Sequence, residues 1–198
     1  MRALGIERIS TRGRDLLDDL KQRGVKEIGL WMSDGNQAML NAISVKFATA
    51  QRQRCVVHKM ENVLSYVPQK QREQIEPELK ALFYQKSRQA ADQAVAAFIE
   101  KYQRVYPTAI ECLQRDLEAS LTFYAFPKKH WKTIRTSNVI ERLFGEVKRR
   151  SHKMAAAFRN EGSCVLLFYA VIRSLKFNKL TMPSTSQAQP DSELLHNT

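Results

Sequence analysis

Two acidic side chains, far apart in the sequence, stand where they could support chemistry on phosphodiesters. Asp34 belongs to a Ser-Asp-Gly sequence that ends an apolar run, and Glu141 lies in Thr136–Arg142, which opens a basic stretch. Carboxylates on separate elements can hold divalent metal ions for in-line attack on phosphate. The formal net charge of +12 would help to hold a polyanion beside them. Together these features predict a role on nucleic acid.

Each carboxylate also has an ordinary structural explanation. An Asp-Gly pair after a strand forms turns readily, and the aspartate can cap the following helix. Asn138 and Glu141 loosely fit the reciprocal capping box, in which a glutamate three residues after the cap stabilises a helix start. For Asp34 taken alone, the turn is the more common role. Catalysis therefore requires both residues to serve one site.

Helical spacing separates Glu141 from its neighbour Glu146. At 100° per residue, we expect a buried face made of Ile140, Leu143, Phe144 and Val147. Glu141 then lies at the edge of that face, on a flank shared with Gly145, Lys148 and His152, where a phosphate has room to approach. Glu146 lies on the other flank, one turn from basic residues, and is expected to form surface ion pairs. We therefore favour Glu141 as the site residue.

The elements that position Asp34 follow from the pattern of the first 58 residues. We expect a helix at 11–23, a buried strand at 27–32 that ends just before Asp34, a helix at 36–47 and a second strand at 54–57. Alternating helices and strands indicate a parallel α/β sheet, in which ligands bind beyond the C-terminal ends of the strands.

The remaining sequence is predicted to be helical. Residues 59–124 carry three apolar stripes at helical spacing, which indicate packing faces. Pro68 and Pro107 suit the first turns of helices, and Ser87 suits an N-cap. Residues 126–131 are expected to form a loop. Further helices are expected at 138–152 and 163–179, followed by a disordered tail at 181–198.

Three widely spaced cysteines argue against a disulfide framework and favour a reducing compartment, so a cytoplasmic location is expected. Cys55-Val-Val-His58 is half of a zinc-ligand spacing, and the other histidines and cysteines could complete it only through the fold. We favour a buried cysteine and a hydrogen-bonded histidine at a strand end instead. The longest apolar stretch is too short to cross a bilayer, so no membrane role is expected.

With these residues in hand, the chain resembles the Mutator-like transposases of bacterial insertion sequences. The resemblance runs, in order, through Asp15–Gly24, Ser33–Gly35, Gln53–Asn62 and Trp131–Arg150, and covers most of residues 10–180. Single pieces are weak signals, but all of them in this order are specific. The resemblance implies DNA strand cleavage and transfer by an Asp-Asp-Glu triad on a ribonuclease H-like fold.

The resemblance also assigns roles to individual residues. It implies that Asp34 is the second aspartate and Glu141 the glutamate of the triad, and that Cys55 and His58 form the family's Cys-x-x-His element. Two Mg²⁺ ions would be held by the complete triad. The family's first aspartate lies before the segment that matches Asp15–Gly24. We therefore expect a C-terminal portion of a transposase that is inactive alone.

The expected domains follow from the same resemblance. We expect a partial ribonuclease H-like core at 1–58, a helical insertion at 59–130, and the catalytic and basic helices of the core at 131–180. The fold class is thus α/β, with an incomplete parallel-sheet core, a large all-helical insertion and C-terminal helices.

DNA is the expected partner, because 32 basic residues exceed 20 acidic ones and cluster in short runs. Backbone phosphates are expected to contact Arg142, Lys148, Arg149 and Arg150. A terminal nucleotide could be gripped by Lys128, Lys129 and Trp131, although a core position for Trp131 is equally open. A synaptic complex implies a homo-oligomer. The alternatives are a non-catalytic basic helical protein that binds DNA or a transposase, and a metal-dependent nuclease of another family.

Overall fold

The computed structural model describes residues 13–152 and 161–174. The chain divides into two compact units, Met1–Ser137 and Asn138–Thr198, which are considered separately. The described part of the first holds a small sheet and most of the helices, and the described part of the second holds two helices. No helix of the described residues is both long enough and apolar enough to cross a membrane.

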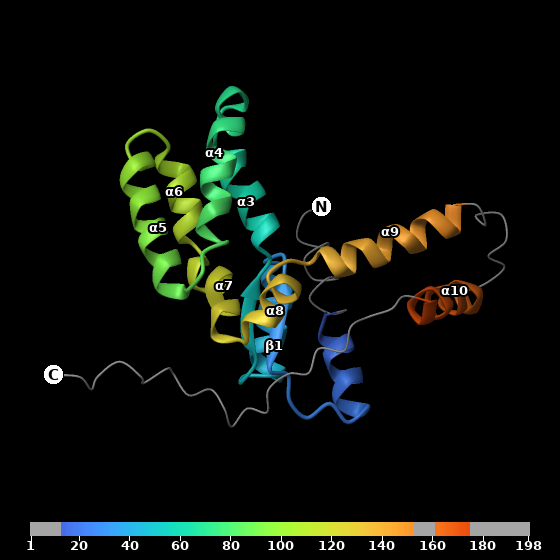
Figure 1. The fold of residues 1–198 in the computed structure, drawn as a ribbon. Coiled ribbons are helices and arrows are strands. Elements are labelled where there is room, and N and C mark those ends of the chain that lie inside the picture. The colour runs from blue at the N-terminus through green and yellow to red at the C-terminus, as the bar shows by residue number, and fades with distance from the viewer. Residues whose placement is uncertain (1–12, 153–160, 175–198) are drawn as a thin grey trace, which may run out of the picture. The chain divides into compact units, whose positions relative to one another are not determined.

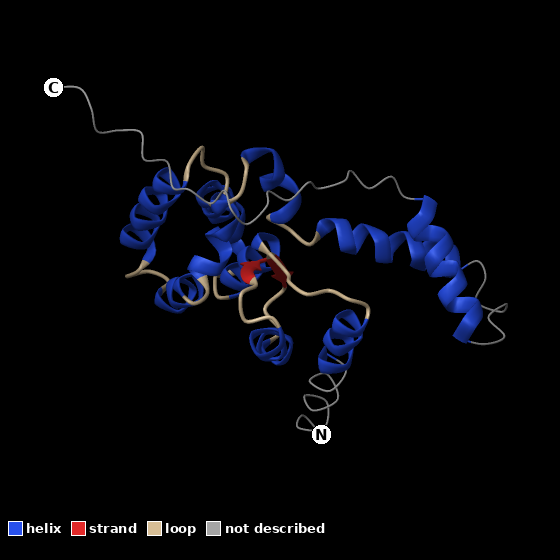
Figure 2. Cartoon of the chain, turned by 90° about the horizontal axis from the view of Figure 1, so that it is seen from below, coloured by secondary structure: helices blue, strands red, loops and turns tan. Residues whose placement is uncertain are grey.

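The sheet consists of two parallel strands, β1 (Leu30–Ser33) and β2 (Gln51–Arg54), with Ser33 paired to Arg54. Helix α2 (Gln37–Lys46) connects them, and the Asn36 side chain caps it by accepting from the backbone N–H of Met39. Figure 2 shows these short strands among the helices of the first unit. The predicted parallel sheet and the helix after Asp34 are confirmed.

The predicted strand positions were displaced along the chain. The first strand lies at Leu30–Ser33 rather than 27–32, and the second at Gln51–Arg54 rather than 54–57. The second strand has the sequence Gln-Arg-Gln-Arg and therefore no apolar pattern. Its residues Gln53 and Arg54 are nevertheless buried. The apolar residues that suggested a strand instead begin helix α3 (Val56–Ser65).

Each face of the sheet packs on a different core. Residues paired across parallel strands point to the same face. Trp31 packs on a small core of Leu17, Ala42, Ile43 and Phe47, to which the helix at residues 13–22 and α2 contribute. Leu30, on the opposite face, packs on the larger core of the helical insertion.

Residues 59–130, predicted to be a helical insertion and called the insertion below, form helices joined by short connections. After α3 come α4 (Gln69–Leu82), α5 (Arg88–Tyr102), α6 (Pro107–Gln114), α7 (Leu117–Leu121) and the 3-10 helix η1 (Thr122–Ala125). Helices α3 to α6 pack side by side as a block (Figure 1). Most buried residues of α4 to α6 come from the three predicted stripes, whereas the buried residues of α3 belong to none of them. Ser87 caps α5, and Pro107 is the first residue of α6. The expected boundary at residue 58 falls inside α3.

Two buried polar side chains fix the insertion to the sheet and to itself. The Gln53 amide nitrogen donates to the Ser120 carbonyl at 3.1 Å, and its oxygen accepts from the Phe123 backbone N–H at 2.7 Å. The Lys59 ammonium donates to the carbonyls of Cys112 and Arg115, at the end of α6. Strand β2 and helix α3 thereby hold the later helices in place.

The loop expected at residues 126–131 is largely helical. Helix α8 (Lys128–Ile134) begins directly after Pro127, whose fixed φ suits the residue before a helix. Its buried side chains, His130 and Ile134, lie four residues apart, so they share one face. This helix was not predicted because it is short and begins with two lysines, which gave no clear apolar pattern.

The described residues of the second unit form two helices, α9 (Asn138–His152) and α10 (Glu161–Ser174). The predicted α9 is confirmed, whereas residues 175–179 and the predicted tail at 181–198 lie outside the described residues. The expected apolar face of α9 is only partly covered, because Val147 is buried but Ile140 and Phe144 are 47% and 56% exposed. Phe144 meets Phe168 of α10 edge to face.

Candidate functional site

Asp34 directly follows β1, at the C-terminal edge of the parallel sheet, where the sequence predicted it. Its side chain is exposed, and its Oδ1 accepts from the backbone N–H of Asn36 at 3.2 Å, forming a tight turn. The cap of α2 is Asn36, so helix capping does not account for Asp34. The turn therefore presents a carboxylate at the sheet edge where ligands bind in α/β folds.

Arg54 lies beside this turn, at the end of the neighbouring strand. Gly35 has φ +93°, and a Cβ at this residue would lie 1.1 Å from Nη1 of Arg54. The turn after Asp34 thus requires glycine both for its backbone conformation and for the space that the guanidinium fills. The sequence placed Arg54 at the start of a predicted strand and assigned it no role, because nothing in its spacing reveals that the side chain is 6% exposed.

The Cys-x-x-His element begins a helix rather than ending a strand. Cys55 is the residue before α3, and His58 lies in the first turn. The Cys55 backbone N–H donates to the Ser33 carbonyl at 2.8 Å, which places the element at the same sheet edge as Asp34. The expectation of a buried cysteine is confirmed, whereas the strand geometry inferred for Cys55 and His58 is wrong.

Ser137 completes a cluster with these two residues. Its hydroxyl and its backbone N–H donate to the Cys55 sulfur at 3.2 and 3.3 Å, and the hydroxyl lies 3.4 Å from Nδ1 of His58. The Val56 backbone N–H also donates to the Arg135 carbonyl at 3.0 Å. We call Cys55, His58 and Ser137 the α3 clamp, because they tie residues 135–137 to the start of α3.

The α3 clamp alters the acidity of its thiol. Burial alone would raise the pKa of Cys55, but hydrogen bonds from the backbone N–H of His58 and from Ser137 outweigh burial. The pKa of Cys55 therefore lies below its ordinary value. A thiol at a helix N-terminus that accepts several hydrogen bonds has this property because they stabilise the thiolate.

Metal ligands are not gathered into a full set in the part of the chain that the structure describes. No group of three or more His, Cys, Asp and Glu side chains that could hold a metal ion is found there. Ser137, which contacts both Cys55 and His58, is a poor zinc ligand. Asp34 belongs to the first unit and Glu141 to the second.

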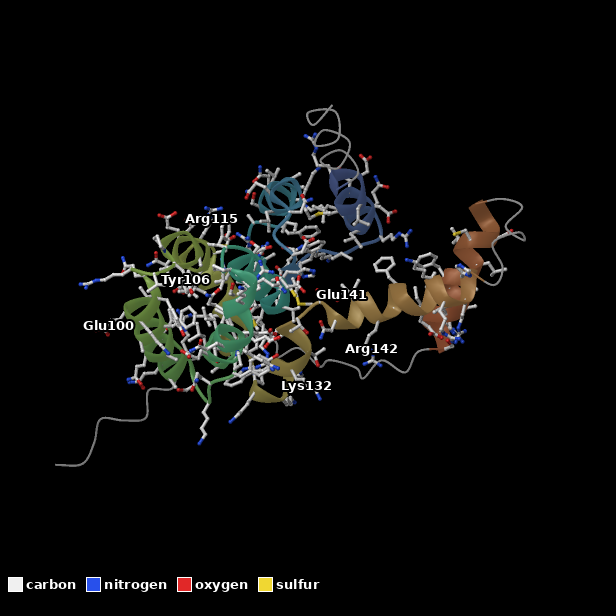
Figure 3. The ribbon with its side chains drawn as sticks, turned by 90° about the horizontal axis from the view of Figure 1, so that it is seen from above. Glu100, Tyr106, Arg115, Lys132, Glu141 and Arg142 are labelled. Atoms are coloured by element: carbon white, nitrogen blue, oxygen red, sulfur yellow. The ribbon has the colours of Figure 1, made fainter. Side chains whose placement is uncertain are left out.

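Glu141 lies in the first turn of α9 and is exposed. Figure 3 shows Glu141 and Arg142 near the beginning of this helix, with side chains that leave it in different directions. Arg142 is exposed as well. An acidic residue in the first turn suits the positive end of the helix dipole, so this position also favours helix formation.

Glu146 forms the surface ion pairs predicted for it. Its carboxylate lies 2.7 Å from Nη2 of Arg149 and 2.9 Å from Nε of Arg150. Hydrogen bonds from Arg149 and then Arg150 lower the pKa of Glu146 to about 2. Two of the predicted phosphate contacts, Arg149 and Arg150, are thus engaged by a carboxylate. The side chain of Lys148 is exposed.

The basic residues before the second unit lie on α8. Lys128 and Lys129 are exposed at its start. Trp131 is half-buried against the insertion core, and its indole N–H donates to the Phe126 carbonyl at 2.7 Å. The Lys128 ammonium lies 5.8 Å from the Trp131 ring centroid. These contacts fit the core alternative for Trp131, and its stacking on a nucleotide stays a prediction.

Comparison with known proteins gives a consistent result. Residues 9–179 match the family described as "Transposase, Mutator family". The chain is 36% identical over 138 residues to the transposase for insertion sequence element IST2 of Acidithiobacillus ferrooxidans, covering 69% of this chain and 47% of that protein. It is 32% identical over 158 residues to the transposase for insertion sequence element ISRM5 of Rhizobium meliloti strain 1021, covering 80% and 39%.

A third relative is the transposase for insertion sequence element IS1201 of Lactobacillus helveticus, with 35% identity over 150 residues, covering 75% of this chain and 40% of that protein. The chain therefore spans less than half the length of these curated relatives. The matched region includes Asp34, the α3 clamp and Glu141. By this match, the chain belongs to the Mutator family of transposases.

Proposed function

We propose that this chain forms part of a metal-dependent catalytic domain that cleaves and joins DNA strands in transposition. The observation that carries the proposal is the exposed Asp34 carboxylate at the C-terminal edge of a parallel strand, inside the region matched to the transposase family. The parallel sheet, the helical insertion and the acidic first turn of α9 follow the order expected of an interrupted ribonuclease H-like fold.

Asp34 and Glu141 are the proposed metal ligands. Both are exposed carboxylates, the ligand type that Mg²⁺ prefers, and Asp34 lies in a turn that already fixes its backbone. Bound Mg²⁺ would supply an activated oxygen nucleophile and stabilise the leaving oxygen. The resemblance assigns a third carboxylate to the site. With only these two, we expect weak metal binding and no strand cleavage.

The other residues are proposed to hold and orient the DNA. Exposed Arg142 and Lys148 would contact backbone phosphates, as would Arg149 and Arg150 once DNA competes with Glu146. Lys128 and Lys129 would add positive charge next to the DNA end. The α3 clamp would fix the segment that leads into the helix of Glu141. Joining two transposon ends further implies that the chain acts as a homo-oligomer.

The proposal is tested by metal binding and by DNA nicking. Isothermal titration with Mn²⁺, a stand-in for Mg²⁺, is compared for the unaltered chain, Asp34→Asn and Glu141→Gln. Each substitution keeps the side-chain shape and removes one anionic ligand, so we expect affinity to fall at least about tenfold. Asp15→Asn and Glu100→Gln, at exposed positions of the first unit, serve as matched controls.

Nicking of supercoiled plasmid in Mg²⁺ gives the second readout. We expect DNA binding without nicking by the isolated chain. Nicking that Asp34→Asn abolishes would confirm the site and refute the expected inactivity. Equal Mn²⁺ binding by all five proteins would refute the metal site and favour a non-catalytic DNA-binding role.

A further inference from the structure

Arg54 is a buried cation without a partner among the residues that the structure describes. The residue is 6% exposed, and no ion pair of its guanidinium is found in this part of the chain. Its Nε has no hydrogen-bond acceptor, as is also true of Nε of Arg52. Arg52, on the same face of β2, shows the contrast, because its Nη2 lies 3.2 Å from Asp116. Of the two arginines in β2, Arg54 is thus the one that has no anionic partner among the described residues.

The surroundings of Arg54 increase the need for an anion. Lys59 is also buried, and its pKa lies below the ordinary value mainly because of burial. Cys112 and Asp116 oppose this shift, and the positive charge of Arg54 adds to it. A guanidinium cannot shed its proton at neutral pH, so burying it carries a free-energy cost that a bound anion would offset.

The position of Arg54 indicates which anion this is. Arg54 is paired with Ser33, the residue before Asp34, so its guanidinium lies at the sheet edge that carries the proposed metal ligand. Nη1 occupies the space over Gly35 that any larger residue would fill. The guanidinium plane presents parallel N–H donors, and this geometry matches two oxygens of a phosphate.

We propose that Arg54 binds a backbone phosphate of DNA beside Asp34, and this inference rests on the proposed function. Gly35 keeps the guanidinium against the Asp34 turn, so one phosphate would be held between a cationic and a metal-binding side chain. The carboxylate of Asp34 and the guanidinium of Arg54 would then act on the same group from different strands. Arg54 therefore takes a binding role, in contrast to the ion-paired Arg52.

The first experiment observes Arg54 in the unaltered chain. The ¹⁵Nε–¹H NMR signal of Arg54 is assigned by its loss in Arg54→Lys and followed during titration with a 20-base-pair duplex and with inorganic phosphate. We expect both anions to shift the Arg54 signal and to leave the Arg52 signal nearly unchanged. A stationary Arg54 signal at saturating DNA would overturn the inference, and would favour a carboxylate as its partner.

The second experiment measures DNA affinity as a function of salt for Arg54→Met and for its matched control Arg52→Met. We expect Arg54→Met to weaken binding about tenfold and to lower the slope of log affinity against log salt by about 0.9, the value for one phosphate that the protein no longer neutralises. Arg52→Met should change affinity less than about twofold, because Asp116 already neutralises that side chain. Equal effects of the two substitutions would overturn the inference.

The outcomes separate this inference from the proposed function. If Arg54 responds to DNA while Asp34→Asn leaves Mn²⁺ binding unchanged, the phosphate site stands and the metal site fails. If Asp34→Asn abolishes Mn²⁺ binding while Arg54 does not respond to DNA, the inference about Arg54 fails alone. Thermal unfolding of every variant shows whether an altered affinity reflects loss of the fold.

Discussion

Ser137 lies against Cys55, and both its hydroxyl and its backbone N–H donate to the cysteine sulfur, at 3.2 and 3.3 Å. The two residues are 82 positions apart, so this contact joins the start of α3 to the segment after α8. It also gives the Cys-x-x-His element a structural role that does not require a metal ion. His58 supports the same serine from one helical turn further on.

Replacing Ser137 tests the α3 clamp. Ser137→Ala removes the hydroxyl, which helps to lower the pKa of the Cys55 thiol, so we expect that pKa to rise. The missing hydrogen bonds should reduce the free energy of unfolding by about 1–2 kcal/mol. Thiolate absorbance, measured in a Cys112→Ser, Cys164→Ser background, reports the pKa, and urea unfolding reports the stability. Ser44→Ala, which alters an exposed hydroxyl on α2, should change neither quantity.

The lowered pKa of Cys55 predicts a pH dependence of stability. As pH rises through the folded-state pKa, the folded thiol loses its proton while the unfolded thiol keeps it, up to its ordinary pKa of about 8.5. The unfolded state then binds more protons, so the free energy of unfolding should increase with pH in this window. Urea unfolding between pH 6 and pH 9 would measure the increase. A Cys55→Ala variant with the same slope would contradict this assignment.

Gln53 should contribute more to stability than its polar side chain suggests. Gln53→Ala leaves the buried Phe123 N–H and the Ser120 carbonyl without their side-chain partner, so we expect a loss of about 2–4 kcal/mol in the free energy of unfolding. Gln51→Ala, at an exposed position of the same strand, is the matched control and should cost about 0.5 kcal/mol or less. Similar losses from the two variants would show that strand propensity dominates.

The basic end of α9 should determine the salt dependence of DNA binding. Replacing Lys148, Arg149 and Arg150 with alanine together should lower the slope of log affinity against log salt by about 0.9 for each phosphate that these side chains neutralise. The control replaces three exposed basic residues of the insertion, Lys70, Lys86 and Arg104. Fluorescence anisotropy with a 20-base-pair duplex measures both slopes. Equal slopes for the two triple variants would place the DNA surface elsewhere.

Glu146→Gln should strengthen DNA binding. Glu146 engages Arg149 and Arg150, so its loss of charge makes both guanidinium groups available to phosphates. We expect affinity to rise about twofold to tenfold at low salt, with the gain disappearing at high salt through screening. The same anisotropy titration measures it, with Glu100→Gln as the control. A fall in affinity would mean that Glu146 orders these arginines for binding.

Local sequence signals predicted the elements that are stabilised locally. Helix α2 begins after Asn36, and α5 begins after Ser87, because these side chains accept from backbone N–H groups within their own first turn. Strand β2 was misplaced because its buried residues, Gln53 and Arg54, are polar. Gln53 is buried because it bonds to residues about 70 positions away, which a short window of sequence does not contain.

In the candidate site, too, the features set by local sequence were predicted and those set by distant contacts were not. Asp34 was located correctly, since an apolar run followed by Asp-Gly marks the end of a strand. The partnership of Ser137 with Cys55 and the burial of Arg54 depend on contacts between distant segments. Arg54 had one usable signal, a glycine directly after Asp34, but its importance appears only when the space over Gly35 is known.

The polar links from β2 and α3 have a consequence for protein engineering. Gln53 holds the last turns of the insertion, and Lys59 holds the end of α6, so both ends of the insertion are fastened near the sheet. The connection between α5 and α6 lies away from these attachments, and its residues 103–105 are exposed (Figure 1). A fluorescent protein or affinity tag spliced into this connection would extend the chain outward while the edge bearing Asp34 and Arg54 kept its geometry.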